Sequence, residues 1–171
     1  MGEDFPREWM LMPYRRYAEF SGRSRRKEYW MFYLLTMIVL VVGYALMLSG
    51  GAASLITAAA ADPANPVDPT GVSFGPLFWA GSILLLVWCL ASIVPSLAVT
   101  VRRLHDRNMS GWYLLGFIVA AIVVNMIPLI GQLIYLVMVI GWIVLLALPG
   151  TPGPNQYGPD PLGQADPSVF A

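Results

Sequence analysis

Glu28, His105 and Asp106 are the residues of this sequence whose types could support acid–base or metal chemistry. A catalytic site would require such groups to converge with suitable geometry. His105 and Asp106 are adjacent, however, and adjacent residues of a helix do not face each other. His105 is also the single histidine of the chain, whereas a stable zinc site uses about three or four protein ligands. We therefore predict no catalytic residue, no metal site and no cofactor.

The two acids lie among arginines, which favours a charge-paired cluster over a catalytic one. The candidate cluster consists of Arg23, Arg26, Glu28, Arg102, Arg103, His105 and Asp106. We expect Asp106 to pair with Arg23 or Arg26, and Glu28 to pair with Arg102 or Arg103. A carboxylate and a guanidinium form strong hydrogen bonds, and a buried charge left alone costs more than the pair gains. The cluster is then a structural clamp. The alternative is a binding site for anionic lipid headgroups, because seven basic residues lie in residues 7–27, and several aromatic residues lie among and beside them.

The elements that position these residues are apolar helices. All ten lysines and arginines lie in residues 7–27 and 102–107, and each stretch adjoins a long apolar run. Apolar residues make up 57% and charged residues 12% of the chain, against soluble averages of roughly 45 to 50% and about 25%. This pattern indicates an all-α, multi-pass membrane protein. Basic residues beside spanning segments stay in the cytoplasm, so both stretches are predicted to be cytoplasmic. Nucleic acid binding is not expected, because the cluster is held at the membrane and contains acids.

Two spans are predicted before the second basic stretch, at residues 29–48 and 77–101. Each is long enough for a hydrocarbon core of roughly 30 Å at 1.5 Å per residue. Residues 49–76 contain four prolines, which interrupt a helix, and they contain no lysine or arginine. This composition predicts an external loop. In the second span, Ser92, Ser96, Thr100 and Arg103 share one helical face beside Pro95. We expect that face to turn inward, for helix packing or as a polar pathway.

The apolar run 112–148 is too long for one span and is interrupted by Asn125, Pro128, Gly131 and Gln132. It predicts a helical hairpin with arms at 112–126 and 129–148. Four spans place both termini in the cytoplasm. The alternative is three spans, with a single broken third helix that exports the tail. The chain then divides into a basic segment (1–28), a transmembrane helical domain (29–148) and a Pro/Gly-rich tail (149–171).

Aromatic residues mark the predicted membrane boundaries. Tyr29, Trp30 and Trp112 are expected to act as interface anchors. Ser110 precedes the third apolar run and is expected to be its helix N-cap rather than a nucleophile. Cys89 is the single cysteine, so an internal disulfide is impossible, and its apolar surroundings predict a filler role.

Three motifs occur in a fixed order: F-x-G-R-x-x-R-x-E-Y-W at 20–30, R-R-L-H-D-x-x-x-S-G-W at 102–112 and G-T-P-G-x-N-x-x-G-P-D-P at 150–161. Together they closely resemble domain of unknown function 805, a family of small bacterial inner-membrane proteins. The resemblance covers nearly the whole chain and implies a topology and a bacterial inner-membrane location, without an established activity. This chain differs in its longer Pro- and Ala-rich external loop and longer final apolar segment. The tail motif contributes Gly150, Pro152, Gly153, Asn155, Gly158 and Asp160.

The sequence favours a non-enzymatic module over a transporter or an enzyme. Its expected partners are the lipid bilayer, anionic lipid headgroups, and a second copy of the chain or a partner membrane protein. The predicted spans offer only Ser, Thr, Asn and Gln as polar groups, so a path for charged solutes is disfavoured. The first alternative is a component of a transporter or channel for small uncharged solutes. The second, less favoured, is a membrane-embedded enzyme. We also expect Asp160 and the carbonyls of the tail to dock against both basic motifs.

Overall fold

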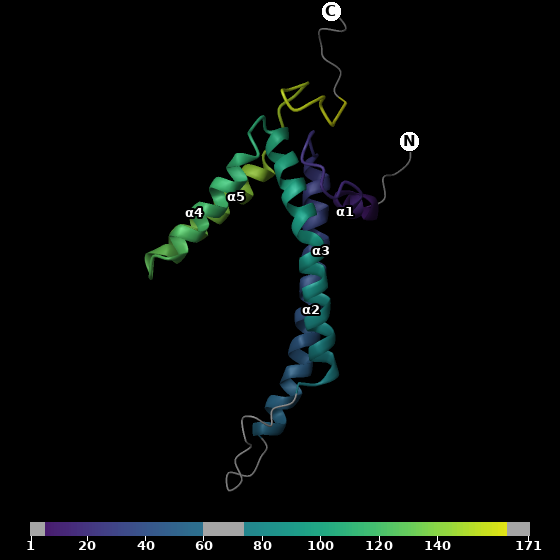
Figure 1. Cartoon of the computed structure of the whole chain (residues 1–171), viewed down its shortest axis with the longest axis vertical. Helices are drawn as coiled ribbons and strands as arrows, with labels where there is room; N and C mark the ends of the chain where they lie inside the picture. The colour runs from purple at the N-terminus through teal and green to yellow at the C-terminus, as the bar shows by residue number, and fades with distance from the viewer. Residues whose placement is uncertain (1–5, 60–73, 164–171) are drawn as a thin grey trace, which may run out of the picture. The chain divides into compact units, whose positions relative to one another are not determined.

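The computed structural model of the protein describes residues 6–59 and 74–163, and every regular element in them is a helix (Figure 1). The elements are α1 (Pro6–Arg15), α2 (Arg26–Ala59), α3 (Pro76–Asp106), α4 (Trp112–Asn125) and α5 (Ile130–Ala147). Contacts group the chain into two units. The first unit contains the residues up to 32 and from 94 onward, and the second contains residues 33–93. The predicted all-α class is confirmed for the described part of the chain.

Three of these helices are long and apolar enough to cross a membrane, over Arg26–Gly51, Pro76–Asp106 and Ile130–Ala147. The fourth predicted span, α4, is apolar but has only 14 residues. At 1.5 Å per residue it is about 21 Å long, shorter than a hydrocarbon core of roughly 30 Å. The structure therefore contains three helices of spanning length and one shorter apolar helix, where the sequence predicted four spans.

Two helix boundaries differ from the predicted spans. Helix α2 continues to Ala59, through residues that were expected to begin the external loop. The prediction was wrong there because residues 49–59 contain no proline and several alanines, so nothing in them stops a helix. The Pro-rich part of the predicted loop, 60–73, lies outside the described residues. Helix α3 extends past residue 101 to Asp106, which places its last turns among charged residues.

In the second unit, α2 and α3 approach each other closely at glycines. A Cβ atom added to Gly81 would lie 2.7 Å from the backbone nitrogen of Met47 on α2, and one added to Gly43 would lie 2.6 Å from Leu85 Cγ on α3. A Cβ at Gly50 would likewise meet the backbone of Phe78. Small residues of this kind let membrane helices pack backbone against backbone. Of the predicted inward face of α3, Ser92 is buried in this unit, Thr100 and Arg103 are buried in the first unit, and Ser96 is half-buried.

In the first unit, α4 and α5 lie side by side as a hairpin (Figure 1). Phe117 of α4 stacks on Trp142 of α5, with ring centroids 4.4 Å apart. The turn is tight: Leu129 has a φ of 63°, and Gly131 packs against Val124. No residue of α4 is buried, and α5 buries only Gly131 and Leu146. Helices that are apolar on all sides and still exposed are suited to a lipid environment. The arms differ from the predicted bounds by one residue at Met126, Leu129 and Leu148.

Replacing Gly81 by alanine is expected to destabilise the α2–α3 pair. The new methyl group would overlap the backbone of α2, and such overpacking typically costs about 1 to 3 kcal/mol. Gly116→Ala on α4 is the matched control, because no atom lies within 4 Å of its added Cβ. There the higher helix propensity of alanine predicts a small gain, up to about 1 kcal/mol. Thermal unfolding of both variants in the same detergent measures the difference, and equal effects at the two positions would contradict the close approach.

Candidate functional site

The arginine cluster of this protein comprises Arg23, Glu28, Arg102, Arg103 and Asp106, all in the first unit. Arg23 lies between α1 and α2, Glu28 lies in the first turn of α2, and the other three lie in the last turns of α3. All five residues are buried, with Arg102 and Arg103 at 0% exposure. Charges buried to this degree are stable only when they are paired and hydrogen-bonded. The partners of the guanidinium groups therefore determine what the cluster can do.

Arg102 joins the end of α3 to the N-terminal segment. Its Nη2 donates to Glu28 Oε1 at 2.9 Å, and its Nε donates to Ser24 Oγ at 2.8 Å. Its Nη1 donates to the backbone carbonyl of Glu19. The Ser24 N–H in turn donates to the Arg102 carbonyl at 3.1 Å. Every nitrogen of this guanidinium is therefore occupied by a group of the protein.

Asp106 is held between two arginines. Arg23 Nε donates to Asp106 Oδ1 at 3.0 Å, and Arg103 Nη1 donates to Asp106 Oδ2. From the sequence we expected one of two arginines as the partner of each acid. In the structure, Asp106 pairs with Arg23 and Glu28 pairs with Arg102. Arg103, considered as a partner of Glu28, is instead paired with Asp106, three residues along its own helix.

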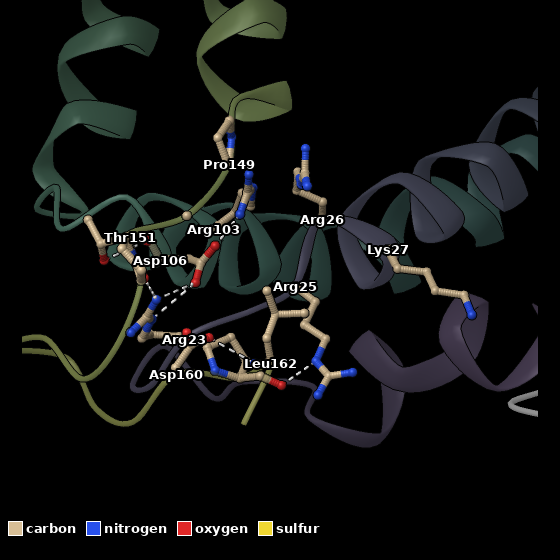
Figure 2. Close-up of a pocket in the computed structure, with 13 residues that line it drawn as sticks. Arg23, Arg25, Arg26, Lys27, Arg103, Asp106, Pro149, Thr151, Asp160 and Leu162 are labelled. Atoms are coloured by element: carbon tan, nitrogen blue, oxygen red, sulfur yellow. Dashed lines mark hydrogen bonds and ion pairs between the residues drawn. The ribbon is translucent and has the colours of Figure 1, made fainter. Parts of the chain in front are cut away.

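The same arginines hold the end of α5 and the tail through backbone carbonyls. Arg103 donates to the carbonyls of Leu146, at 2.9 Å, and Leu148. Arg23 donates to the Thr151 carbonyl at 2.6 Å (Figure 2) and to the Gly153 carbonyl, also at 2.6 Å. Arginine is well suited to this role because its planar group carries five donors in a fixed arrangement. The cluster thus connects the N-terminal segment, the end of α3, the end of α5 and the tail.

The tail motif has a defined shape against α3. The Thr151 N–H donates to the Asp106 carbonyl at 2.8 Å, and Asn155 Nδ2 donates to the His105 carbonyl at 3.0 Å. A short β-bridge joins Asn155 to Gly158, whose φ of 134° favours glycine. Gly150 packs directly on the Asp106 side chain, where an added Cβ would lie 2.6 Å from Cγ. A glycine is required at Gly150 because of space rather than backbone conformation.

His105 takes part in this docking. Its ring stacks on the Tyr157 ring with centroids 3.9 Å apart and an interplanar angle of 3°, and its Nδ1 lies 3.2 Å from the Gly22 carbonyl oxygen. Its side chain therefore contacts the tail and the N-terminal segment. Across residues 6–59 and 74–163, no group of three or more His, Cys, Asp or Glu residues could hold a metal ion.

Asp160 does not dock on the basic motifs through its carboxylate, contrary to the prediction. Its Oδ2 accepts the Gly153 N–H at 3.1 Å and its Oδ1 accepts the Leu162 N–H at 2.9 Å. The aspartate thus stabilises the turns of the tail, as Asp side chains often do in turns. The docking itself is made by carbonyls: Arg25 donates to the Pro161 carbonyl, and Arg107 donates to the Pro149 carbonyl at 2.9 Å. Pro152 lines the cavity described below.

The expected interface anchors differ in exposure. Tyr29 is buried at 5% and meets Trp30 edge-to-face at 5.3 Å, while Trp30 and Trp112 are 38% and 76% exposed. Gly111, not Ser110, is the N-cap residue of α4, so the predicted cap was wrong by one position. The Ser110 hydroxyl still accepts the Trp112 N–H, at 3.3 Å.

Arg16 and Glu19 form a surface pair beside the cluster. Arg16 Nε donates to Glu19 Oε2 at 2.8 Å, and this hydrogen bond holds the pKa of Glu19 below its usual value. Arg16 also lies 3.8 Å from Glu28 Oε2, which connects the pair to the buried cluster. An exposed pair of this kind adds little stability.

A cavity of about 600 Å³ opens between the start of α2, the end of α3 and the tail (Figure 2). Five basic and two acidic residues line it, so its walls carry a formal charge of 5 − 2 = +3. Arg26, which the sequence placed in the cluster, lies on the wall of this cavity and is exposed. The structure thus divides the charged residues that the sequence grouped together. Most form a buried cluster whose guanidinium groups are hydrogen-bonded to the protein, whereas Arg26 lies on the exposed wall of the cavity.

Three residues of the site were missed by sequence reasoning: Ser24, Thr151 and Tyr157. Each lies inside one of the three sequence motifs, at positions 20–30 or 150–161. That placement was the available signal, because a small polar or aromatic residue within a motif of charged residues has few other roles. Their partners could not be deduced, since they lie on α3, far along the sequence.

Removing Arg103 is expected to destabilise the first unit far more than removing Arg107. Arg103→Ala leaves the Asp106 carboxylate with one arginine fewer and the Leu146 and Leu148 carbonyls without their donor. Breaking a buried pair in this way typically costs about 3 to 5 kcal/mol. Arg107→Ala removes the same charge near the same helix end but only one exposed hydrogen bond. Its expected cost is below about 1 kcal/mol. Thermal unfolding of the two variants tests this ranking, and a milder effect at Arg103 would refute it.

The family model described as Protein of unknown function (DUF805) matches residues 17–159, a range that includes the first two motifs, the third motif up to Pro159, and the arginine cluster. Inner membrane protein YhaI of Escherichia coli (strain K12) is 33% identical over 155 residues, covering 90% of this chain and 95% of YhaI. Inner membrane protein YhaH of the same strain is 34% identical over 158 residues, covering 90% of this chain and 96% of YhaH. No solved structure matches the chain significantly.

The relatives agree with the physical properties of the helices. Both are named inner membrane proteins, and three helices of this chain have the length and apolar composition of transmembrane segments. The resemblance inferred from the three motifs is confirmed by the family match over nearly the same residues. This chain is therefore a bacterial inner-membrane protein with transmembrane helices, and it belongs to the DUF805 family.

Proposed function

We propose that this protein is a non-enzymatic, multi-pass module of the inner membrane that binds anionic lipid at its cytoplasmic side. The observation that carries the proposal is the combination of a buried, fully hydrogen-bonded arginine cluster with an adjacent basic cavity. The cluster fixes the relative positions of four chain segments, and the cavity offers positive charge that the cluster does not use. A fixed basic surface next to membrane helices suits an anionic headgroup.

The contacts of Arg103 support a topology in which the tail and the basic motifs share one side. Arg103 holds the Leu146 and Leu148 carbonyls, while Trp112 follows α3 after a short loop. Both ends of the α4–α5 hairpin therefore lie at the C-terminal end of α3. This holds whether α4 crosses the bilayer fully or enters it only in part. With the basic stretches in the cytoplasm, we propose that both termini are cytoplasmic and that the hairpin enters the bilayer from that side, as a third and a fourth span if α4 crosses fully.

The engagement of the acid–base side chains supports a non-enzymatic role. Glu28 and Asp106 are paired with arginines, and His105 is stacked against the tail. These groups are thus bound to other parts of the protein and do not converge on one open site, as acid–base catalysis would require.

Polar groups of the membrane helices are also engaged locally, which disfavours a solute path. Ser82 Oγ donates to the Phe78 carbonyl, and Thr100 Oγ1 donates to the Ser96 carbonyl. Asn125 Nδ2 donates to the Ala121 carbonyl at 2.8 Å. Each of these bonds returns to the preceding turn of the same helix, a common way to satisfy such side chains in membranes. We therefore favour a lipid-binding module over a transporter of small solutes.

The proposed orientation predicts different labelling of two introduced thiols. In a Cys89→Ser background, the Ser73→Cys thiol is expected to react with a membrane-impermeant maleimide in intact spheroplasts, because it lies between α2 and α3. The Ser168→Cys thiol in the tail is expected to react only after lysis. Mass spectrometry of the labelled protein measures both. Labelling of the tail thiol in intact spheroplasts would refute the proposed topology.

The proposed function also predicts that anionic lipid copurifies with the protein. Protein extracted gently and examined by native mass spectrometry is expected to retain anionic phospholipid at a higher proportion than the membrane from which it was taken. The bulk lipid extract of the same membrane is the control. Retention at the bulk proportion would count against lipid binding, and a stoichiometric copurified protein would point to a partner membrane protein instead.

A further inference from the structure

The charges of the basic cavity fall into two groups that differ in how far they are already used. The inner wall contains Arg23, Arg103 and Asp106 of the arginine cluster. Both arginines donate to the aspartate and to backbone carbonyls, and both are buried. Their donors are taken by the protein itself, so they contribute positive potential to the cavity but few hydrogen bonds to a ligand.

The outer wall contains three further cations, Arg25, Arg26 and Lys27, at the start of α2. Arg26 and Lys27 are exposed, and Arg25 donates to the Pro161 carbonyl, which carries no charge to neutralise it. Trp9 of α1 lies against two of the three, with its ring centroid 5.7 Å from Arg25 Cζ and 5.1 Å from Lys27 Nζ. Cation–π contacts of this kind restrict the positions of long basic side chains and leave their charge intact. Among residues 6–59 and 74–163, no carboxylate forms an ion pair with these three cations, and the ring of Trp9 helps to order two of them.

The two acids of the cavity offset only part of its positive charge. Asp106 is shared by Arg23 and Arg103, and both oxygens of Asp160 accept backbone N–H groups of the tail. Asp106 offsets one of the two inner arginines, and Asp160 offsets one outer cation. Three positive charges remain in a cavity with room for about 600 Å³. A guanidinium and an ammonium together bind phosphate oxygens well, the first as a planar fork and the second as a point charge.

We propose that this cavity is a binding site for a phosphate ester, with Arg26 and Lys27 as the residues that contact the phosphate. The inference deepens the proposed lipid-binding function and rests on it. The charge excess favours an anion, and the pairing of the inner arginines directs the ligand to the outer wall. Figure 2 shows the side chains of Arg26 and Lys27 extending in different directions from the first turn of α2, with Arg25 turned toward the tail.

Two sources can supply this chemistry, a lipid headgroup and a soluble phosphate ester. The position of the cavity favours the lipid. Its basic wall lies at the start of α2, the first helix of spanning length, and its tail wall includes the apolar side chain of Leu162, which is 59% exposed. An acyl chain could then follow the apolar surface of the helices. The experiment distinguishes the two sources.

The test uses the full-length protein in a neutral detergent and four probes. These are dihexanoyl phosphatidylglycerol, dihexanoylglycerol, glycerol 3-phosphate and inorganic phosphate, with Kd measured by native mass spectrometry. The variant Arg26→Gln/Lys27→Gln removes two outer cations that take no part in the arginine cluster. The matched control, Arg7→Gln/Arg15→Gln, removes two exposed charges from α1, neither of which lines the cavity.

The wild-type protein is expected to bind phosphatidylglycerol and not the phosphate-free diacylglycerol. Each basic residue near a membrane surface contributes about fivefold in affinity, so the double variant is expected to lose on the order of 25-fold. The control is expected to change by less than about threefold, because screening weakens distant charges. Equal binding of glycerol 3-phosphate and phosphatidylglycerol would identify a soluble ester as the ligand and keep the cavity assignment.

Three results would overturn the inference. The first is equal affinity of the wild-type protein for the lipids with and without phosphate, which requires no variant and so does not depend on folding. The second is unchanged affinity of the double variant, and the third is an equal loss in the control. Anionic lipid that copurifies with the protein and is unaffected by the double variant would sink this site while leaving the proposed function intact. Absence of anionic lipid from the purified protein would remove the function itself.

Discussion

The rest of the first unit depends on the burial of two adjacent guanidinium groups at the end of α3. Arg102 and Arg103 are fully inaccessible to solvent, and each carries five N–H donors. Buried donors without partners would cost several kcal/mol, so the surrounding chain must supply acceptors from more than one direction. Arg102 obtains them from Ser24, Glu28 and the carbonyl of Glu19. Arg103 obtains them from Asp106 and the end of α5. Because successive residues of a helix point in different directions, two adjacent arginines recruit two different parts of the chain.

This requirement explains the composition of the tail. A helix leaves its last four carbonyls without intrahelical partners, and the donors of Arg103 satisfy two carbonyls at the end of α5. Beyond α5, the tail carbonyls can accept hydrogen bonds from the arginines only if they are not already bonded within a helix or a sheet. Proline serves this purpose because it has a carbonyl but no N–H. Gly150 leaves room for the Asp106 side chain, and Asp160 uses its carboxylate to hold the turns together. The Gly/Pro-rich tail is thus an ordered acceptor surface shaped by arginines that lie far away in the sequence.

Much of the fold could be predicted from the sequence, because apolar runs and basic stretches obey the strong constraints of a bilayer. The helices α3, α4 and α5 begin close to their predicted positions, and the pairing of acids with arginines follows from charge alone. Three features could not be predicted. The first is the end of α2, which continues to Ala59 because residues 49–59 contain no proline to break the helix. The contact of His105 with Tyr157 joins residues that no local pattern connects. Both carboxylate oxygens of Asp160 accept amide hydrogens of the tail itself, a role that charge complementarity alone does not reveal.

The division of labour among the basic residues follows from the same constraint. A structural clamp and a binding site are opposed demands on one arginine, since a guanidinium whose donors are all bonded to the protein has none left for a ligand. The sequence offered these roles as alternatives for a single group of residues. The structure places Arg102 and Arg103 at 0% exposure with protein acceptors, and places Arg26 and Lys27 on the exposed wall of the cavity. The buried arginines still influence that cavity, because Asp106 offsets only one of the two charges that hold it. The cluster that stabilises the fold therefore also adds a positive electrostatic potential to the cavity, and it does so without placing more charged side chains on the surface.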